Sequence, residues 1–267
     1  MTNSPKANPL KGKIALVTAS SSGIGYACAE SLSFSGAKVL ICSHNKNKIS
    51  NAANKIKIKT GNEVIEFTCD LTNRENIESF ISNIIDHFKK IDILVYNHGN
   101  PTSGNFTKIS LKKWESSFSQ ILLPAFILTK HIIPIMKKNK WGRIFFINSI
   151  FAKEPDPDYI ISSTFRAALL AYSKCLSKEL ASSNIAINSI LPGYTDTQLL
   201  RNLLEKESKN SDKAKFIILK SWLSKSPLNK LIDPTSIGEL ICHLAKQKDP
   251  IITGSSIPID GGFLNSF

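Results

Sequence analysis

The sequence predicts an α/β protein built on a doubly wound parallel sheet of about seven strands, with helices on both faces. Apolar runs rich in β-branched residues alternate with segments of helical periodicity along the whole chain. The runs are apolar on both faces, which is typical of strands covered by helices on each side. Because no linker or repeat divides the chain, we expect residues 1–267 to form a single domain.

The first half of the chain predicts four strands and the three helices between them. The first helix is closed by a glycine, and an Asp-Leu-Thr-Asn sequence starts the third. The predicted strands are Lys13–Ala19, Lys38–Cys42, Val64–Thr68 and Ile91–Tyr96, and the predicted helices are Ile24–Phe34, Lys46–Lys59 and Ile77–Phe88.

The second half begins with a long predicted helix, roughly Ser110–Lys138, that contains two prolines. A buried strand then ends at Ser149, and a loop leads into an amphipathic helix. The remaining predicted elements are the strand Ile185–Leu191, a polar helical segment Gln198–Ser224, the helix Pro234–Ala245 and the strand Ser256–Ile259. The segment 198–224 has no strand of its own, so we interpret it as an inserted substrate lid with apolar contact residues Leu199, Leu200, Leu203, Leu204, Phe216 and Ile217.

The composition is that of an ordinary globular protein, with 42% hydrophobic and 21% charged residues. No run of eighteen apolar residues occurs and no apolar segment precedes the first strand, so we expect neither a membrane span nor a secretory signal. Five cysteines without C-x-x-C spacing favour buried thiols in a reducing compartment, and the histidines lack metal-binding spacing. These features predict a cytoplasmic protein without a metal site.

The net charge of +13 allows two interpretations. A basic protein can bind a polyanion such as nucleic acid. The excess, however, comes from 30 Lys against 4 Arg, spread along the whole chain, whereas nucleic-acid interfaces favour Arg forks and aromatic platforms. We therefore attribute the charge to a general use of lysine and expect no nucleic-acid partner. A basic surface is also compatible with a phosphorylated cofactor or an acidic carrier protein.

A turn rich in serine and glycine, Thr18–Gly25, lies between the first strand and the first helix. Free amide groups and the helix dipole at such a place favour a pyrophosphate. Gly23 would let the backbone approach a phosphate, and Gly25 would let the helix pack on the strand. The turn thus predicts a dinucleotide site with the residues Ala19, Ser21, Ser22, Gly23, Ile24 and Gly25.

Four further motifs follow in order: Asp70-Leu71, Asn97-His98-Gly99, the sequence from Pro192-Gly193 to Thr195 and Thr197, and the pair Ile252-Thr-Gly254 and Asp260-Gly-Gly262. Together with the turn they resemble the short-chain dehydrogenases/reductases, a Rossmann-type family, over nearly the whole chain. The resemblance implies that Asp70 and Leu71 contact adenine. It also implies that Asn97, His98 and Gly99 belong to the cofactor site, with His98 beside the nicotinamide ribose. Pro192 and Gly193 belong to the same site, and the threonines that follow them, Thr195 and Thr197, would face the nicotinamide amide.

The resemblance also indicates which cofactor is used. Family members that use NAD hold the adenosine 2′-hydroxyl with an acidic residue at the end of the second strand, where this chain has Ser43, His44 and Asn45. No carboxylate would repel a 2′-phosphate there, which favours NADP(H). The arginine that many NADP enzymes carry in the phosphate turn is replaced by Ser22.

The family's catalytic residues are Asn, Ser, Tyr and Lys, and the resemblance extends to the serine alone. Ser149 fits that serine, whereas Ile121, Ser162 and Arg166 stand at the other three places, and Tyr-x-x-x-Lys occurs nowhere in the sequence. Ser162 and Arg166 are four residues apart and share one helix face. This pattern resembles a divergent beta-ketoacyl-acyl-carrier-protein reductase-like subgroup that lacks the usual tetrad.

Two hypotheses follow from these residues. In the first, the protein reduces a ketone or acyl thioester, or oxidises an alcohol, with Ser149, Ser162 and Arg166 binding the oxygen and the nicotinamide ribose. The proton donor is then His98, Tyr159, Tyr194 or water. In the second, the protein binds a dinucleotide without dehydrogenase chemistry, as a sensor or partner subunit. The resemblance further implies a homotetramer or homodimer joined through helices 110–138 and 162–183.

Overall fold

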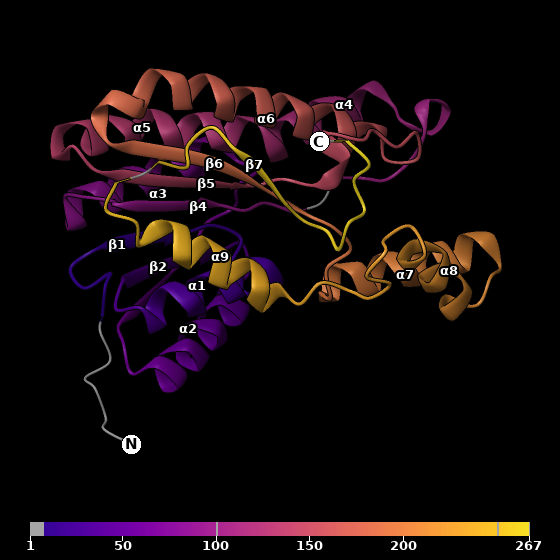
Figure 1. Ribbon diagram of the computed structural model, residues 1–267, viewed down its shortest axis with the longest axis horizontal. Helices are drawn as coiled ribbons and strands as arrows, with labels where there is room; N and C mark the ends of the chain where they lie inside the picture. Colours follow the sequence, from indigo (N-terminus) through magenta and orange to yellow (C-terminus); the bar gives the residue numbers. More distant parts are fainter. Residues whose placement is uncertain (1–7, 100, 250, 267) are drawn as a thin grey trace.

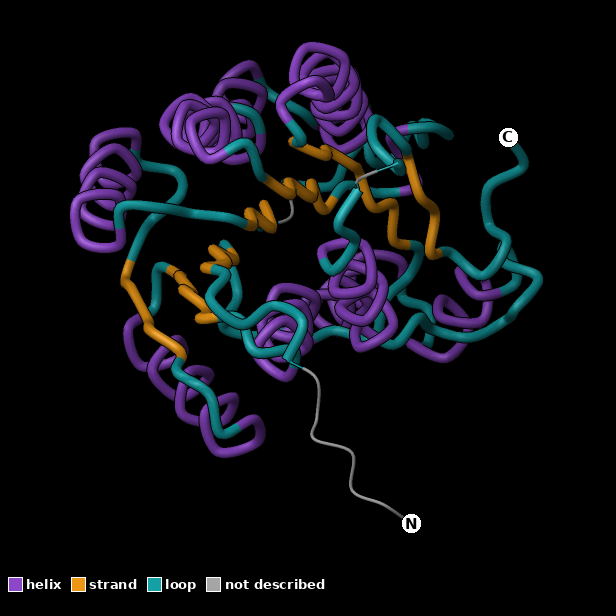
Figure 2. Tube along the Cα trace, turned by 60° about the vertical axis from the view of Figure 1, so that its left-hand side comes forward, coloured by secondary structure: helices purple, strands orange, loops and turns teal. Residues whose placement is uncertain are grey.

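The computed structural model describes residues 8–99, 101–249 and 251–266. Residues 1–7, 100, 250 and 267 lie outside this description, and with them most of the predicted N-terminal arm. Seven strands form one sheet in the order β3-β2-β1-β4-β5-β6-β7, and every neighbouring pair is parallel. Helices cover both faces of the sheet (Figures 1 and 2). The predicted doubly wound fold is confirmed.

The strands occur where the apolar runs predicted them, with ends that differ by a few residues. β1 ends earlier than predicted, because Thr18 and Ala19 bend into the turn before α1, and β4 begins two residues later than predicted, at Ile93. The bounds are β1 Ile14–Val17, β2 Lys38–Ser43, β3 Val64–Thr68, β4 Ile93–Tyr96, β5 Gly142–Ile147, β6 Ile185–Pro192 and β7 Ser256–Ile259.

Nine α-helices lie within the described residues. Their bounds are α1 Gly23–Phe34, α2 Lys46–Thr60, α3 Arg74–Phe88, α4 Leu111–Ile121, α5 Leu123–Asn139, α6 Ile160–Leu180, α7 Gln198–Ser211, α8 Lys215–Leu223 and α9 Pro234–Ala245.

The core consists of two layers, one on each side of the sheet. In β1, Ala15 and Val17 pack with α1, α2 and α9, whereas Ile14 and Leu16 face the layer formed with α3 to α6. Successive side chains of a strand point to opposite faces, so a strand buried on both faces must be apolar throughout. This explains why the strands read as continuous apolar runs.

The predicted helix Ser110–Lys138 is two helices, α4 and α5, which meet at Leu122. Pro124 lies in the first turn of α5, where its missing N–H group costs no hydrogen bond. The combined segment of 29 residues is long and apolar enough to cross a membrane by length and composition. Yet Ile121, Leu128 and Ile132 are fully buried against the sheet, so the segment packs as a core helix pair.

The predicted lid segment contains the helices α7 and α8. They follow the carboxyl end of β6 and project beyond the sheet (Figure 1). Thr197 starts α7 by accepting a hydrogen bond from the Leu200 backbone N–H at 3.2 Å, which satisfies one of the free amides of the first turn.

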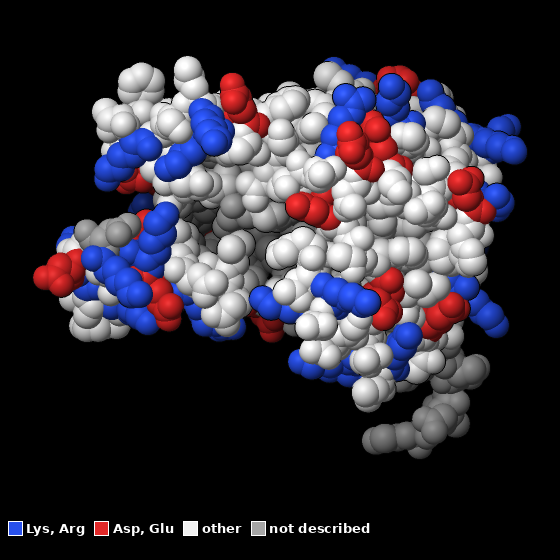
Figure 3. Space-filling view, turned by 180° about the vertical axis from the view of Figure 1, so that it is seen from behind, with Lys and Arg blue, Asp and Glu red and all other residues white. Residues whose placement is uncertain are grey.

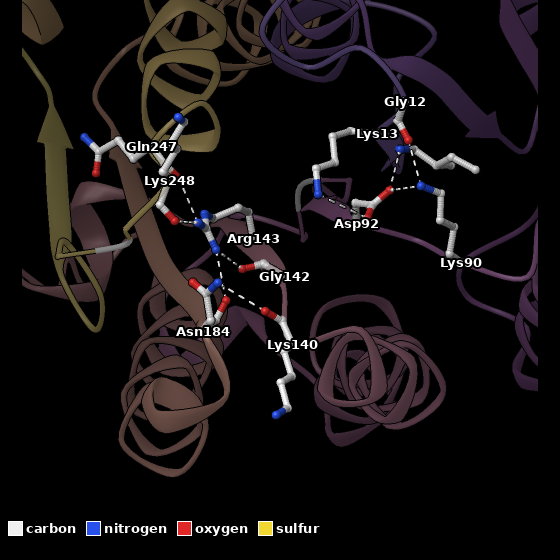
Figure 4. A network of polar contacts seen from close by, with 11 residues as sticks. Gly12, Lys13, Lys90, Asp92, Lys140, Gly142, Arg143, Asn184, Gln247 and Lys248 are labelled. Atoms are coloured by element: carbon white, nitrogen blue, oxygen red, sulfur yellow. Dashed lines mark hydrogen bonds and ion pairs between the residues drawn. The ribbon is translucent and has the colours of Figure 1, made fainter.

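The amino end of β5 is held by a buried arginine (Figure 4). Arg143 is fully buried in β5, and its guanidinium donates hydrogen bonds of 2.7–3.0 Å to four backbone carbonyls, those of Gly142, Asn184, Gln247 and Lys248. A guanidinium presents several donors in a fixed plane, so one side chain can join three chain segments here. Beside it, Asp92 accepts from the Ile14 backbone N–H at 2.8 Å.

The five cysteines are free thiols. Four of them are buried, as the sequence predicted, whereas Cys175 on α6 is exposed, contrary to the prediction. Lys and Arg side chains are distributed over the face shown in Figure 3 with Asp and Glu between them. On that face they form no continuous basic stripe, which agrees with the interpretation of the net charge as a general use of lysine.

Candidate active site

The phosphate turn after β1 takes a left-handed course at two positions. Gly23 has a φ of 58°, and Ala19 has a φ of 45°, which an L side chain rarely adopts. The Asn97 side chain donates to the Ala19 carbonyl at 3.0 Å and so supports this conformation. A Cβ atom on Gly25 would lie 2.6 Å from the same carbonyl, so only glycine lets α1 pack this closely.

The first turn of α1 keeps its backbone amides free of side-chain caps. Ser22 is the N-cap residue but makes no side-chain capping bond, whereas Asn45 and Asn73 cap α2 and α3 with their side-chain oxygens. Ser21 and Ile24 are half-buried in the same turn. An uncapped helix start at the carboxyl edge of a parallel sheet is suited to a phosphate group.

The end of β2 forms the second part of the predicted cofactor site. Ser43 is buried, and its hydroxyl donates to the Asn45 carbonyl at 3.2 Å. His44 is exposed between them. Segment 43–46 carries no carboxylate, so only neutral and basic groups lie at the position predicted for a 2′-phosphate.

Asp70 and Leu71 follow β3, next to the end of β2. The Cys69 backbone N–H donates to the Ser43 carbonyl at 3.0 Å, which joins the two strand ends. The Asp70 carboxylate accepts from both the backbone N–H and the hydroxyl of Thr72, at 2.9 and 2.8 Å. Leu71 packs half-buried against the core, so these two residues are fixed at the edge of the site.

The end of β4 is joined to the phosphate turn. Thr18 donates its hydroxyl proton to the Asn97 carbonyl at 2.6 Å and accepts from the Asn97 backbone N–H at 2.9 Å. Gly99 lies so close to α4 that a Cβ there would be 2.8 Å from the Gln120 side chain. The predicted residues Asn97, His98 and Gly99 therefore sit directly beside the turn.

His98 is buried, and its environment keeps it neutral. Its Nδ1 lies 2.6 Å from the Gly99 carbonyl, which can only accept, so we assign the ring proton to Nδ1. Burial lowers the pKa of His98 to about 3, with a further contribution from the Arg166 guanidinium. Nε2 is therefore an acceptor, and it has no hydrogen-bond partner among the described residues.

Ser149 and Arg166 are brought together by the residue before Ser149. The Asn148 side chain donates to the Arg166 carbonyl at 3.1 Å, and the Arg166 guanidinium donates in return to the Asn148 carbonyl. This reciprocal pair fixes α6 on the end of β5. Burial lowers the pKa of Arg166 to about 10, so the side chain keeps its charge at neutral pH.

Each of the two predicted serines accepts one hydrogen bond. Ser162 Oγ accepts a hydrogen bond from Arg166 Nε at 3.1 Å, and Ser149 Oγ accepts from the Phe151 backbone N–H at 3.3 Å. Since each oxygen is engaged as an acceptor, its own O–H remains available to a ligand oxygen. The predicted shared helix face of Ser162 and Arg166 is realised as a direct bond.

Two residues of this cluster were not predicted from the sequence. Asn148 was not singled out, although an amide at the end of a buried strand is an unusual choice and could have drawn attention. The Tyr96 hydroxyl donates to the Ile121 carbonyl at 2.8 Å, and its ring lies 5.6 Å from that of His98. Tyr96 and His98 thus form a buried pair of rings.

The loop after β6 joins the cofactor side to the lid. Thr195 donates to the Gly193 carbonyl at 3.0 Å, and Pro192 ends the strand. A Cβ on Gly23 would lie 3.1 Å from the Thr197 methyl group, so the phosphate turn and the start of α7 are in contact. The structure thus brings the predicted cofactor residues and the lid to one edge of the sheet.

The two tyrosines considered as proton donors are half-buried near each other. Burial raises the pKa of Tyr159, and the Tyr194 phenol adds to the rise. Burial also raises the pKa of Tyr194, to about 12, with Asp156 contributing. Both phenols are therefore weaker acids than free tyrosine.

Comparison with known proteins identifies the family. The sequence profile of a family described as enoyl-(acyl carrier protein) reductase matches residues 18–264. The 3-oxoacyl-[acyl-carrier-protein] reductase FabG of Aquifex aeolicus is 30% identical over 95% of this chain and 98% of its own length. Human dehydrogenase/reductase SDR family member 4 is 29% identical over 96% of this chain and 88% of its own length. The chain belongs to the short-chain dehydrogenase/reductase family.

Solved structures of two reductases superpose on this one over almost its whole length. L-Sorbose reductase from Gluconobacter frateurii, complexed with NADPH and L-sorbose, covers 97% of this chain with a TM-score of 0.90 and 27% identity. YwfH, an NADPH dependent reductase involved in bacilysin biosynthesis, covers 96% with a TM-score of 0.90 and 26% identity. The protein is thus an oxidoreductase of this family by sequence and by fold.

Proposed function

We propose that the protein is an NADPH-dependent reductase that converts a carbonyl group into an alcohol with an atypical active site. The observation that carries this proposal is the linked set Ser162, Arg166, Asn148 and Ser149 at the carboxyl edge of the sheet. Two hydroxyl donors beside a fixed positive charge are the groups that a developing negative charge on oxygen requires.

The described residues fit NADP(H). The uncapped start of α1 and the close packing at Gly25 leave a cradle for the pyrophosphate, and Ser43, His44 and Asn45 offer no carboxylate against a 2′-phosphate. The NADPH in the L-sorbose reductase structure supports the same cofactor here. The residues that would hold it are Ala19, Ser21, Ser22, Gly23, Ile24, Gly25, Ser43, His44, Asn45, Asp70, Leu71, Asn97, His98, Gly99, Arg166, Pro192, Gly193, Thr195 and Thr197.

When bound, NADPH supplies a hydride for the carbonyl carbon, and a proton must reach the carbonyl oxygen. Ser149 and Ser162 donate hydrogen bonds to that oxygen, and the charge of Arg166 acts through Ser162 Oγ. The Ser162 proton passes to the oxygen, and water in the cleft replaces it. The result is one alcohol and one NADP⁺ for each NADPH and proton consumed.

The buried groups around the serines make water the best candidate for the ultimate proton source. His98 is neutral and its only N–H is directed at the Gly99 carbonyl, so it has no proton to give. The raised pKa values of Tyr159 and Tyr194 make them poor acids. Positioned acid catalysis is worth about 10²- to 10⁴-fold, so turnover should be slow compared with an enzyme that has a tuned tyrosine.

The substrate class is a ketone or a 3-oxoacyl thioester. The thioester is supported by the relatives that are 3-oxoacyl-[acyl-carrier-protein] reductases. The lid segment 198–224 exposes Leu199, Phe216 and Ile217, which would contact apolar parts of a substrate. We further propose cytoplasmic localisation and a homotetramer or homodimer joined through helices 110–138 and 162–183.

The alternative is a dinucleotide-binding protein that does not reduce carbonyls. One experiment separates the two functions. NADPH and NADH are titrated by fluorescence, and NADPH oxidation is then followed with a panel of ketones that includes a β-ketoacyl thioester. We expect tighter binding of NADPH than of NADH, together with turnover of at least one ketone. Binding without turnover would support the alternative, and no binding of either dinucleotide would refute both.

A matched pair of variants tests the cofactor assignment. Ser43→Asp places a carboxylate beside the expected 2′-phosphate and should weaken NADPH binding by about tenfold or more, with little effect on NADH. Asn54→Asp, at an exposed position of α2, is the control and should change neither affinity. Equal losses for both dinucleotides in Ser43→Asp would contradict the assignment.

A further inference from the structure

Five aromatic side chains lie around the carboxyl ends of β5 and β6, and we call them the aromatic wall: Phe151, Tyr159, Tyr194, Trp222 and Phe263. Phe151 and Tyr159 form its first part. Their rings are stacked, with centroids 4.8 Å apart and planes 13° from parallel. Because the Phe151 backbone N–H bonds to Ser149 Oγ, this stack begins directly beside the candidate active site.

The second part comes from three separate segments. Tyr194 follows β6, Trp222 lies in the lid helix α8, and Phe263 comes after β7. The Tyr194 and Trp222 rings stack at 5.2 Å with planes 5° apart, and Phe263 meets Tyr194 edge-on at 6.0 Å. The lid is therefore held to the body by aromatic contacts next to the substrate side of β6.

The two parts lie near each other, because Lys225, three residues after Trp222, is 3.9 Å from the carboxylate of Asp156, three residues before Tyr159. The Tyr194 phenol and the Asp156 carboxylate also contribute to the raised pKa of Tyr159. Both tyrosines are half-buried, and neither hydroxyl has a hydrogen-bond partner among the described residues. The protein surface is hollowed where the lid meets the body, at the left in Figure 3.

A rigid planar ring would suit this wall better than a flexible chain. Aromatic pairs gain from offset stacking beyond their buried area, and a rigid group loses little conformational freedom on binding. Resting on the carbonyl reduction proposed above, we propose that the substrate carries an uncharged aromatic or conjugated ring next to its carbonyl, held against Tyr159 and Tyr194. The two phenol hydroxyls then contact polar atoms at the edge of that ring.

The charges around Tyr159 are the reason for an uncharged ring. The carboxylates of Asp156, Asp158 and Glu207 all act on its phenol, and Lys225, 3.9 Å from Asp156, balances one of them. A carboxylate on the ring would add a further negative charge beside these three carboxylates. We therefore expect discrimination against anionic rings.

The test compares two ketones of equal carbon number, acetophenone and 2-octanone, with NADPH. We expect kcat/KM to be at least about tenfold higher for acetophenone, since stacking and rigidity both favour the ring. Tyr159→Leu should reduce this preference to about twofold or less, Tyr159→Phe should keep it, and Tyr26→Leu, a ring on α1, should leave it unchanged. Replacing 4-acetylbenzamide by 4-acetylbenzoate should lower kcat/KM by about tenfold.

Binding measurements keep this proposal separate from the proposed function. Dissociation constants of both ketones for the NADP⁺-loaded protein are measured by tryptophan fluorescence, in which Trp222 reports on Tyr194. Tighter binding of acetophenone that Tyr159→Leu abolishes supports the aromatic site even without turnover. Equal affinity and equal kcat/KM for the two ketones, or a preference that survives Tyr159→Leu, would overturn it while leaving carbonyl reduction intact.

Discussion

Replacing Arg166 by methionine tests the role of the guanidinium in catalysis. Methionine keeps most of the apolar volume but removes the charge, the bond to Ser162 Oγ at 3.1 Å and the bond to the Asn148 carbonyl. A hydrogen bond from a charged donor contributes about 1.5–3 kcal/mol, which corresponds to about 10- to 100-fold in rate. We expect kcat for ketone reduction to fall by this factor and KM for the ketone to change less.

The assay is NADPH oxidation at saturating ketone, accompanied by urea unfolding of each variant. Arg166→Lys should retain part of the activity, because one ammonium supplies the charge without the planar fork. Arg74→Met is the matched control, since Arg74 is exposed on α3 and should be silent. A kcat of Arg166→Met within about threefold of the parent would refute the reasoning that Arg166 acts on the substrate through Ser162.

Three further predictions concern His98, Ala19 and Arg143. For His98, the folded pKa of about 3 lies below the unfolded value of about 6.5, so the unfolded state binds more protons between them and stability falls as the pH drops below 6.5. The free energy of unfolding in urea should fall by up to about 2 kcal/mol between pH 6.5 and 5. His98→Leu should remove this pH dependence. If the variant keeps the same dependence on pH, the buried neutral ring is not its cause. Ala19→Val forces a β-branched residue into a φ of 45° and should lower the stability of the fold by about 1–3 kcal/mol and weaken NADPH binding. Ala19→Gly should be nearly neutral. Equal thermal midpoints for the two variants would argue against strain in the turn. Arg143→Met removes the guanidinium that donates to four carbonyls and should lower the free energy of unfolding in urea by at least about 3 kcal/mol. The control Arg74→Met should lower it by less than about 0.5 kcal/mol. A similarly small loss for Arg143→Met would show that water replaces the guanidinium.

The order of strands and helices could be predicted because each strand is buried on both faces and so carries an unbroken apolar run. The division of helix 110–138 could not be located, although its prolines were visible. Pro124 fits either inside a first turn or at a kink, and only the packing of α5 on the sheet decides between them.

Within the site, sequence spacing predicted a contact between residues of the same helix. Contacts between different segments depend on tertiary packing and could not be predicted. Because Ser162 and Arg166 are four positions apart on one helix, the sequence predicted that they would lie on the same face, and they are hydrogen-bonded. The partner of Arg166 is a backbone carbonyl, that of Asn148, which leaves no mark in the sequence. The neutrality of His98 follows from its burial beside Arg166, and the contact of Tyr194 with Phe263 joins positions far apart in the chain. Neither could be read from a motif.

The buried guanidinium of Arg143 has a consequence for motion. It ties the start of β5 to the chain after α9 and to the chain before β6. The amino ends of these strands, which are remote from the serines, are therefore cross-linked. Opening of the cleft should therefore pivot on a fixed base, with α7 and α8 moving while the strands stay still. Amide hydrogen exchange would then be fast in α7 and α8 and slowest in β5 and β6. The strands would act as a rigid base relative to which the two helices move.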